Sequence, residues 1–258
     1  NYMALADATI EACDEYRNYI ALSESMLGHS TADDKLTFQN AINTAKTNFS
    51  TAADADAVRA ISAGLVAAQQ AYCLVASPEE GYPFDMTHLV VNPTFDVNTE
   101  GWSHNTGASN YGRATNQSGA ITGGFYENWD WNSYTGEIYQ EITGLPNGRY
   151  VLTAAAFRDQ LIDNGVDADA VYVFANGEAT LVSSATPALY SVEVSVNTGT
   201  LRFGVRSNTK LYRWMGIDNV TLKFVSGLDL SEFVAAYETA LAAAIAARDN
   251  VEYESVTG

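Results

Sequence analysis

The sequence predicts a multidomain chain of α and β structure, in which a central β-sandwich lies between two helical segments. Three observations lead to this fold class. Apolar residues recur at helical spacing up to about residue 77, the period falls to two from Met86 onward, and the helical period returns after Gly227. We therefore expect three parts, at residues 1–80, 86–226 and 228–258.

The first part is expected to form an N-terminal bundle of three helices. The clearest helix carries an apolar stripe with alternating spacings of three and four residues, typical of helices that pack along their length. Its members are Val58, Ile61, Leu65, Ala68, Tyr72 and Val75. Phe38, Ile42 and Phe49 mark the helix before it, and Pro78 ends the helical region because proline cannot continue a helix.

The central part reads as short strands rich in Val, Tyr, Phe and Thr, without helices between them. The turn signal Asn176-Gly177 predicts a hairpin, and Leu145-Pro146-Asn147-Gly148 predicts a turn. This pattern favours a β-sandwich or jelly roll. The expected strands are His88–Phe95, Glu137–Ile142, Arg149–Phe157, Ala170–Ala175, Glu178–Val182, Tyr190–Val196, Thr200–Arg206 and Met215–Phe224.

The last part is expected to be a helix that Ser231 caps. One face carries Phe233, Tyr237, Leu241 and Ile245. The helix has no predicted partner before Gly258, so we interpret it as the start of a truncated second helical module.

Charge limits the classes of partner. The 258 residues include 13 Lys and Arg against 31 Asp and Glu, a net charge of −18, which repels nucleic acid and anionic lipid surfaces. This composition suits a secreted or surface protein with a neutral ligand, and no apolar run is long enough to span a membrane. Because the chain starts at Asn1 without a signal peptide, we expect that a leader was removed or that the chain is part of a longer protein.

Cys13 and Cys73 are the only cysteines. Their predicted places in the first and third helices are offset too far along parallel helices for a disulfide, so two unpaired thiols are expected. Unpaired thiols leave the redox compartment open, and two cysteines are too few for a structural zinc site.

The β region carries an ordered set of short motifs. They are Val91-Asn92-Pro93-Thr94-Phe95-Asp96, Gly101-Trp102, Tyr126-Glu127-Asn128-Trp129, the stretch Tyr139–Tyr150, and Gly216-Ile217-Asp218-Asn219-Val220-Thr221-Leu222. Together they resemble galactose-binding-like jelly-roll carbohydrate-binding modules, in the versions found in multimodular surface proteins of gut Bacteroidetes between helical-bundle spacers. The resemblance implies non-catalytic binding of a neutral glycan or polysaccharide outside the cell or at its surface.

The same resemblance implies a structural Ca²⁺ between the opening and closing strands. The matching residues are Asp96 and Asp218, with the Thr94 carbonyl as a further ligand. Calcium takes six to eight oxygens, which irregular strand ends can supply. The alternative is that both acids only form turn hydrogen bonds. The acidic run Asp163–Asp169 lacks the spacing of an EF-hand loop, and a solvated loop is the better interpretation there.

Ligand-binding candidates are aromatic rings that stack on sugars and planar polar groups that bind hydroxyls. Trp131 and Tyr134 are the expected exposed platform, whereas Trp129 lies at the family-like position and is more often a packing residue. Tyr111 and Arg113 in a loop, Arg158 at a strand end and Arg213 at a rim complete the set. Asp159 is a candidate together with Arg158, and an ordinary surface ion pair between them is the alternative for both.

The sequence gives little support for an enzyme. None of His29, His88 and His104 lies in a nucleophile or metal-ligating motif. Glu127, Asp130 and Glu137 could supply the carboxylate pair of a glycosidase, but such pairs arise by chance among 31 acids. Three hypotheses follow, in descending order: a glycan-binding module, a structural or adhesive module without sugar binding, and a small glycoside hydrolase.

Overall fold

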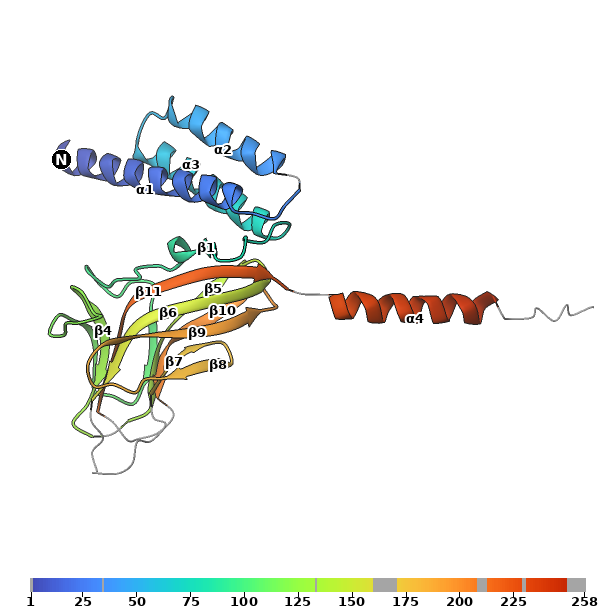
Figure 1. Ribbon diagram of the computed structural model, residues 1–258. Coiled ribbons are helices and arrows are strands. Elements are labelled where there is room, and N and C mark those ends of the chain that lie inside the picture. Colours follow the sequence, from blue (N-terminus) through green and yellow to red (C-terminus); the bar gives the residue numbers. More distant parts are fainter. Residues whose placement is uncertain are drawn as a thin grey trace, which may run out of the picture. The chain divides into compact units, whose positions relative to one another are not determined.

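The computed structural model of the chain describes residues 2–33, 35–132, 134–159, 171–207, 213–228 and 231–249 (Figure 1). The chain divides into two compact units, Asn1–Gly227 and Leu228–Gly258. The predicted combination of helices with a central antiparallel β-sandwich is confirmed. The predicted domain boundary between residues 80 and 86 stays a prediction.

Three helices precede the sandwich: α1 (Tyr2–Gly28), α2 (Leu36–Phe49) and α3 (Ala55–Cys73). The Asp54 side chain caps α3 by accepting a hydrogen bond from the Ala57 amide at 2.9 Å. Phe38 of α2 stacks on Tyr72 of α3, with ring centroids 4.3 Å apart. The apolar stripes of the helices thus meet in one hydrophobic cluster, and Cys13 and Cys73 are free thiols.

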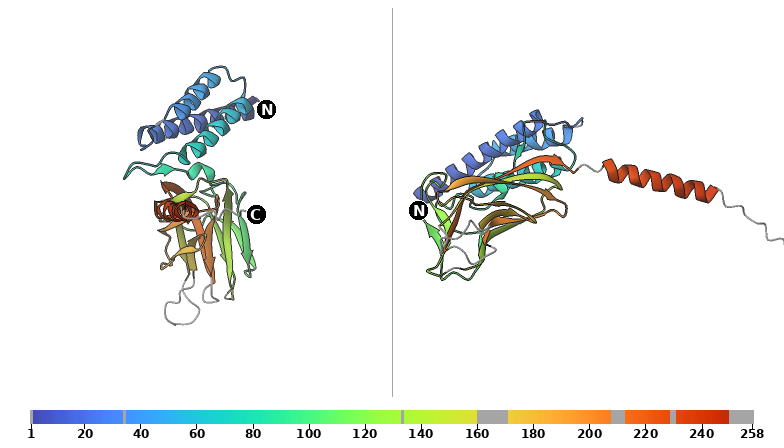
Figure 2. Two further views of the ribbon diagram at one scale, coloured as in Figure 1. Left: turned by 90° about the vertical axis from the view of Figure 1, so that its right-hand side faces the viewer. Right: turned by 60° about the horizontal axis from the view of Figure 1, so that its bottom comes forward.

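The described strands form two antiparallel sheets that face each other (Figures 1 and 2). The first sheet has the order β3-β4-β11-β6-β9, with β1 also paired to β11, and the second has the order β2-β5-β10-β7-β8. The first sheet comprises β1 (Phe84–Asp85), β3 (Asn110–Ala114), β4 (Phe125–Trp129), β6 (Gly148–Arg158), β9 (Ala188–Val196) and β11 (Trp214–Gly227). The second comprises β2 (Ser103–Thr106), β5 (Gly136–Thr143), β7 (Val171–Ala175), β8 (Glu178–Leu181) and β10 (Thr200–Ser207).

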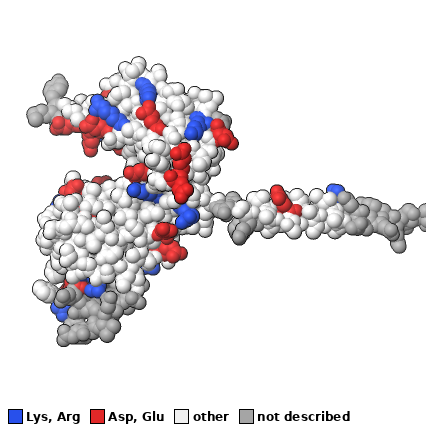
Figure 3. Space-filling model, in the orientation of Figure 1, with Lys and Arg blue, Asp and Glu red and all other residues white. Residues whose placement is uncertain are grey.

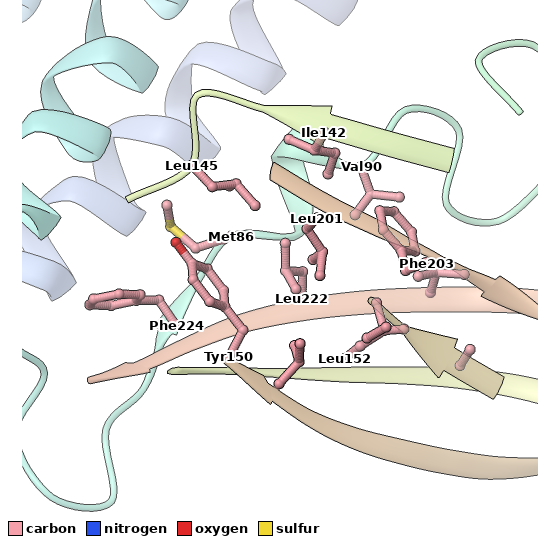
Figure 4. Packing of buried hydrophobic residues seen from close by; sticks show 14 of the residues in the cluster. Met86, Val90, Ile142, Leu145, Tyr150, Leu152, Leu201, Phe203, Leu222 and Phe224 are labelled. Atoms are coloured by element: carbon pink, nitrogen blue, oxygen red, sulfur yellow. The ribbon is translucent and has the colours of Figure 1, made fainter. Parts of the chain in front are cut away.

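The main core of the sandwich lies between the two sheets. Figure 4 shows Leu152 of β6 and Leu222 of β11 directed toward Leu201 and Phe203 of β10. All four side chains are fully buried. Because successive side chains of a strand point to opposite faces, the residues between these core positions face the outer surface of each sheet.

The predicted strand His88–Phe95 is wrong. A short 3₁₀-helix, η1 (Thr87–Leu89), occupies its start, and Asn92 and Phe95 have positive φ values of 51° and 49°, outside the β region of backbone conformation. The first strand is β1, a few residues earlier. Strands β2, β3 and β4 were not predicted, because their apolar residues do not alternate in a clear period of two.

A second, smaller core lies on the outer face of the first sheet. It consists of Ile121, Phe125, Ala155 and Phe157, with Trp214 packed against it. Ile121 belongs to the segment that joins β3 to β4, so this connection folds back over the sheet. The outer face of β4 and β11 therefore holds buried aromatic residues at one end, and it carries the candidate site.

The second unit contains α4 (Ser231–Asp249). Its apolar side chains Val234, Tyr237, Leu241 and Ile245 are exposed. The described helices contain no stretch with the length and apolar character that crossing a bilayer requires.

Candidate ligand-binding site

Three tryptophans surround a cavity of about 410 Å³ on the outer face of the first sheet. The polar groups around them include three carboxylates and one guanidinium, so the cavity offers both aromatic rings and hydrogen-bonding groups. The lining residues are Asn116, Glu127, Trp129, Asp130, Trp131, Asp159, Arg213 and Trp214.

Strand register places the central residues of the cavity. Trp129 of β4 pairs with Trp214 of β11, and Glu127 pairs with Gly216 of β11 and Gly112 of β3. A Cβ atom added at Gly112 would meet nothing within 4 Å, so space is open beside Glu127. At Gly216 a Cβ would lie 2.5 Å from the Phe157 ring. The absence of a side chain at this position therefore leaves room for the aromatic residues that pack under the cavity.

Glu127 and Trp214 are joined directly. The Trp214 indole Nε1–H donates to Glu127 Oε2 at 2.7 Å. Trp214 also packs edge-on against Phe157, with ring centroids 4.8 Å apart and an interplanar angle of 82°. Partial burial raises the pKa of Glu127, and the hydrogen bond from Trp214 opposes this rise. The cavity therefore contains a half-buried acid held in place by an immobilised indole.

The rim of the cavity is a turn that carries Trp131. Its ring is 76% exposed and stands perpendicular to Trp129, with ring centroids 5.8 Å apart. Asp130 fixes this turn, because its carboxylate accepts hydrogen bonds from the backbone amides of Asn132 and Ser109, both at 2.8 Å. These hydrogen bonds lower the pKa of Asp130 to about 2, and the one from the Asn132 amide has the largest effect. The carboxylate is therefore ionised at neutral pH.

Asp159 fixes the opposite rim. Its Oδ1 accepts hydrogen bonds from the backbone amides of Arg213 and Trp214, at 3.0 and 3.3 Å. Burial raises the pKa of Asp159, while these hydrogen bonds and the nearby charges of Arg213 and Arg158 lower it. Arg213 lines the cavity and supplies its one positive charge among the described residues.

Three of the predicted ligand-binding residues, Trp129, Trp131 and Arg213, line this cavity. The prediction of an exposed Tyr134 platform is wrong: the ring is only 3% exposed, and its hydroxyl donates to the Asn128 carbonyl. Arg158 is also buried, and its Nε donates to the Val182 carbonyl at 3.0 Å instead of reaching a ligand surface. Both residues hold the end of the sandwich together.

The other two predicted ligand residues lie outside the cavity. Tyr111 is exposed and lies over the His104 ring, with centroids 3.7 Å apart. Arg113 donates from Nε to the Phe95 carbonyl at 2.7 Å and from Nη2 to the Asp96 carbonyl at 2.6 Å. Arg113 therefore braces the loop that carries Asp96.

Sequence reasoning did not assign Trp214 or Asn116 to the ligand site. Trp214 is partly buried, packs on the outer core and also lines the cavity. Its pairing with Trp129 depends on the register of β4 with β11. These strands are more than 80 residues apart in the sequence, so no local pattern indicates it.

Asp96 and Asp218, near the start and the end of the β region, both accept hydrogen bonds from the segment that contains Thr122 and Gly124. The amide of Gly124 donates to Asp96 at 3.4 Å, and that of Thr122 donates to Asp218 Oδ2 at 3.1 Å. Asp218 is fully buried, and its Oδ1 has no hydrogen-bond partner among the described residues. Burial, with the Asp96 charge as a lesser cause, raises the pKa of Asp218 to about 6.

A buried carboxylate oxygen without a partner fits a cation ligand. No group of three or more His, Cys, Asp or Glu side chains that could hold a metal occurs in the described part of the chain, so carbonyl oxygens would have to complete the set. The acidic run Asp163–Asp169 lies outside the described residues.

No protein-family model matches the chain, and no curated protein matches it. Among solved structures, it is similar to a family 61 carbohydrate-binding module in complex with β-1,4-galactotriose, with 17% identity, a TM-score of 0.36, and coverage of 52% of this chain and 96% of that one. It is also similar to the xylan-binding domain CBM22-1 of Paenibacillus barcinonensis Xyn10C, with 14% identity, a TM-score of 0.37, and coverage of 52% of this chain and 93% of that one. A third similar structure is a Stig cyclase from Fischerella sp. TAU, with 14% identity, a TM-score of 0.38, and coverage of 54% of this chain and 97% of that one. Likeness at this level assigns no ligand to the chain.

Proposed function

We propose that the chain binds a glycan without acidic groups, in the cavity that Trp129, Trp131 and Trp214 surround, and does not cleave it. The observation that carries this proposal is the combination of three indole rings with hydrogen-bonding side chains around one cavity of about 410 Å³. Flat aromatic rings pack against the C–H faces of sugars, and planar polar groups bind their hydroxyls. The exposed ring of Trp131 is the expected stacking platform.

The arrangement favours binding over hydrolysis. Asp130, one of the acids considered for a glycosidase, has both carboxylate oxygens engaged by the turn that it fixes. Asp159 is likewise held by two backbone amides. Their hydrogen bonds give both residues a role in shaping the cavity. This leaves Glu127 as the one acid of the cavity without backbone hydrogen bonds to its carboxylate among the described residues.

We further propose a structural Ca²⁺ between Asp96 and Asp218. The partnerless Oδ1 of Asp218 supports it, because a bound cation would offset the cost of burying this charge. The Thr94 carbonyl is the proposed additional ligand. In this proposal the ion joins the opening and closing segments of the jelly roll and takes no part in sugar recognition.

The wider context is also a proposal. The acidic composition supports a secreted or cell-surface protein with further modules, in which the N-terminal three-helix bundle and α4 act as helical spacers. The alternative function is a structural or adhesive module without sugar binding. The exposed apolar stripe of α4 favours that alternative, because such a stripe suits a protein contact.

A glycan microarray tests the proposed function. The folded chain, with Ca²⁺ present, is applied to a panel of neutral, amino and acidic plant, microbial and animal glycans. Binding to a neutral or amino glycan class, lost in Trp131→Ala, supports the proposal, and binding to acidic glycans alone contradicts it. The control is Tyr237→Ala, which removes an exposed aromatic ring from α4. Folded protein that binds none of the glycans contradicts the proposal, and release of free sugar by the wild type would show a hydrolase.

A further inference from the structure

The charges around the cavity are unequal. Glu127, Asp130 and Asp159 face one positive group, Arg213, and the whole chain carries a net charge of −18. On the face of the molecule that Figure 3 shows, charged side chains gather over the helices, and the sandwich carries fewer. On this face the charge is therefore not spread uniformly.

Among these acids, Glu127 has the least compensation. Asp130 is saturated by hydrogen bonds in its turn, and Asp159 has Arg213 and Arg158 near it. Glu127 makes no ion pair with any described residue, and its one hydrogen-bond donor among them is the neutral Trp214 indole. A half-buried carboxylate without a counter-charge is unfavourable, so a cation in the cavity would stabilise it.

The indole rings add a second attraction for a cation. Tryptophan is the aromatic side chain that binds cations best on its face, and an ammonium group within about 6 Å of the ring gains roughly 0.5–2 kcal/mol. Trp129 and Trp214 flank each other in register beside Glu127, and Trp131 closes the rim. A ligand group between these rings and Glu127 would meet both indoles and a carboxylate.

We propose that the cavity prefers glycans that carry a protonated amino group, with the ammonium placed between Glu127 and the tryptophan rings. This inference rests on the proposed glycan binding and narrows the ligand class. It differs from the neutral ligand that the composition predicts. An acidic sugar would be repelled by the three carboxylates, and an N-acetylated sugar would lose the charge that Glu127 attracts.

The test uses matched glycosides that differ only at one position. Methyl glycosides of glucosamine and galactosamine are titrated against their N-acetylated forms and against methyl glucoside and methyl galactoside, with tryptophan fluorescence and NMR as readouts. At pH 6 and low salt, we expect at least one amino glycoside to bind about fivefold or more tightly than its neutral parent. The advantage should shrink as NaCl is added, because screening weakens charge attraction.

Two variants separate the roles of the acids. Glu127→Gln keeps a hydrogen-bond acceptor for Trp214 but removes the charge, and it should abolish the advantage of the amino glycoside over its neutral parent. Glu141→Gln removes an exposed acid of β5 outside the cavity and should change nothing. The salt series needs only the wild type, so it decides the question even if Glu127→Gln does not fold.

The outcomes distinguish the two proposals. If neutral sugars bind as tightly as amino sugars, the preference for ammonium is contradicted and glycan binding stands. If amino glycosides do not bind while an oligosaccharide from the microarray does, the preference is again contradicted. If no glycan binds by either method, both proposals fail.

Discussion

Trp214 of β11 and Glu127 of β4 are joined side chain to side chain, indole Nε1–H to carboxylate, at 2.7 Å. The bond links two neighbouring strands of the sheet. In their register, Trp214 pairs with Trp129 and Gly216 pairs with Glu127. The bond fixes the Trp214 ring at the edge of the cavity and keeps one acid in a half-buried place. The remaining oxygen of Glu127, Oε1, has no hydrogen-bond partner among the described residues and is available to a ligand.

Glu127 should make the fold less stable as pH rises. Its pKa is raised by burial, so the folded state binds the proton more tightly than the unfolded state. The stabilisation from protonated Glu127 is complete below the pKa that this residue has in the unfolded chain, roughly 4.3. It is lost as the pH rises through the higher pKa of Glu127 in the folded protein. We expect Glu127→Gln, neutral at every pH, to melt at a higher temperature than wild type at pH 7 and at nearly the same temperature at pH 4.

Thermal melts followed by circular dichroism measure this difference. The control is Glu80→Gln, an exposed acid outside the cavity. A Glu127→Gln protein that melts below wild type at pH 7 would show that the charge strengthens the bond to Trp214 by more than its burial costs.

Gly216 should tolerate no side chain. A Cβ there would lie 2.5 Å from Phe157 and 2.9 Å from Phe125, so Gly216→Ala should lower the free energy of unfolding by about 1–3 kcal/mol through overpacking. Gly64 in α3 is the matched opposite case, because a Cβ there meets nothing within 4 Å and the helix gains roughly 0.5–1 kcal/mol. Urea denaturation of both variants compares them, and equal effects of the two substitutions would refute the packing under the cavity.

His88 should make the chain sensitive to acid. The ring packs edge-on against Tyr19 of α1 at 5.2 Å, and both its nitrogens are buried without hydrogen-bond partners among the described residues. Burial lowers the pKa of His88, against an opposing effect of Asp85, so the unfolded state binds the proton more tightly and stability falls as pH drops below about 6.5.

The melting temperature of His88→Phe should therefore fall less between pH 7.5 and pH 5 than that of wild type. His29→Gln, at a partly exposed histidine of the same region, serves as the comparison. An identical acid response of wild type and His88→Phe would exclude His88 as the source.

Removal of calcium should destabilise the sandwich. At a free Ca²⁺ concentration of 100 times the dissociation constant, a bound ion stabilises the fold by about 2.7 kcal/mol. EDTA should lower the melting temperature of wild type, and addition of Ca²⁺ should restore it. Asp218→Asn should melt at the same temperature with and without Ca²⁺, while a wild type unaffected by EDTA would leave Asp96 and Asp218 as turn residues only.

The sequence was sufficient for the strands with a clear period of two and for the turns between them. The Asn176-Gly177 signal, for example, does join β7 to β8, and Asn176 has the positive φ of 51° that such a turn needs. The strand prediction for His88–Phe95 was wrong because this segment is irregular although apolar residues in it pack inward. The spacing of apolar residues alone does not distinguish such a segment from a strand.

The cavity could be predicted only in part. Trp131 was identifiable because a tryptophan in a polar, turn-rich stretch has few ways to be buried. Tyr134, three residues later, was not distinguishable from it, since its burial depends on a hydroxyl bond to the Asn128 carbonyl. Glu127, Trp214 and Asp159 meet through pairing between distant strands and backbone contacts, which the local sequence does not specify.

Isothermal titration calorimetry with the best ligand of the microarray tests the central claim most directly. Wild type, Trp131→Ala and Tyr237→Ala are titrated under identical conditions. The cavity predicts that Trp131→Ala weakens binding by about tenfold or more, with Tyr237→Ala equal to wild type. Equal affinities of wild type and Trp131→Ala would contradict glycan binding at this cavity.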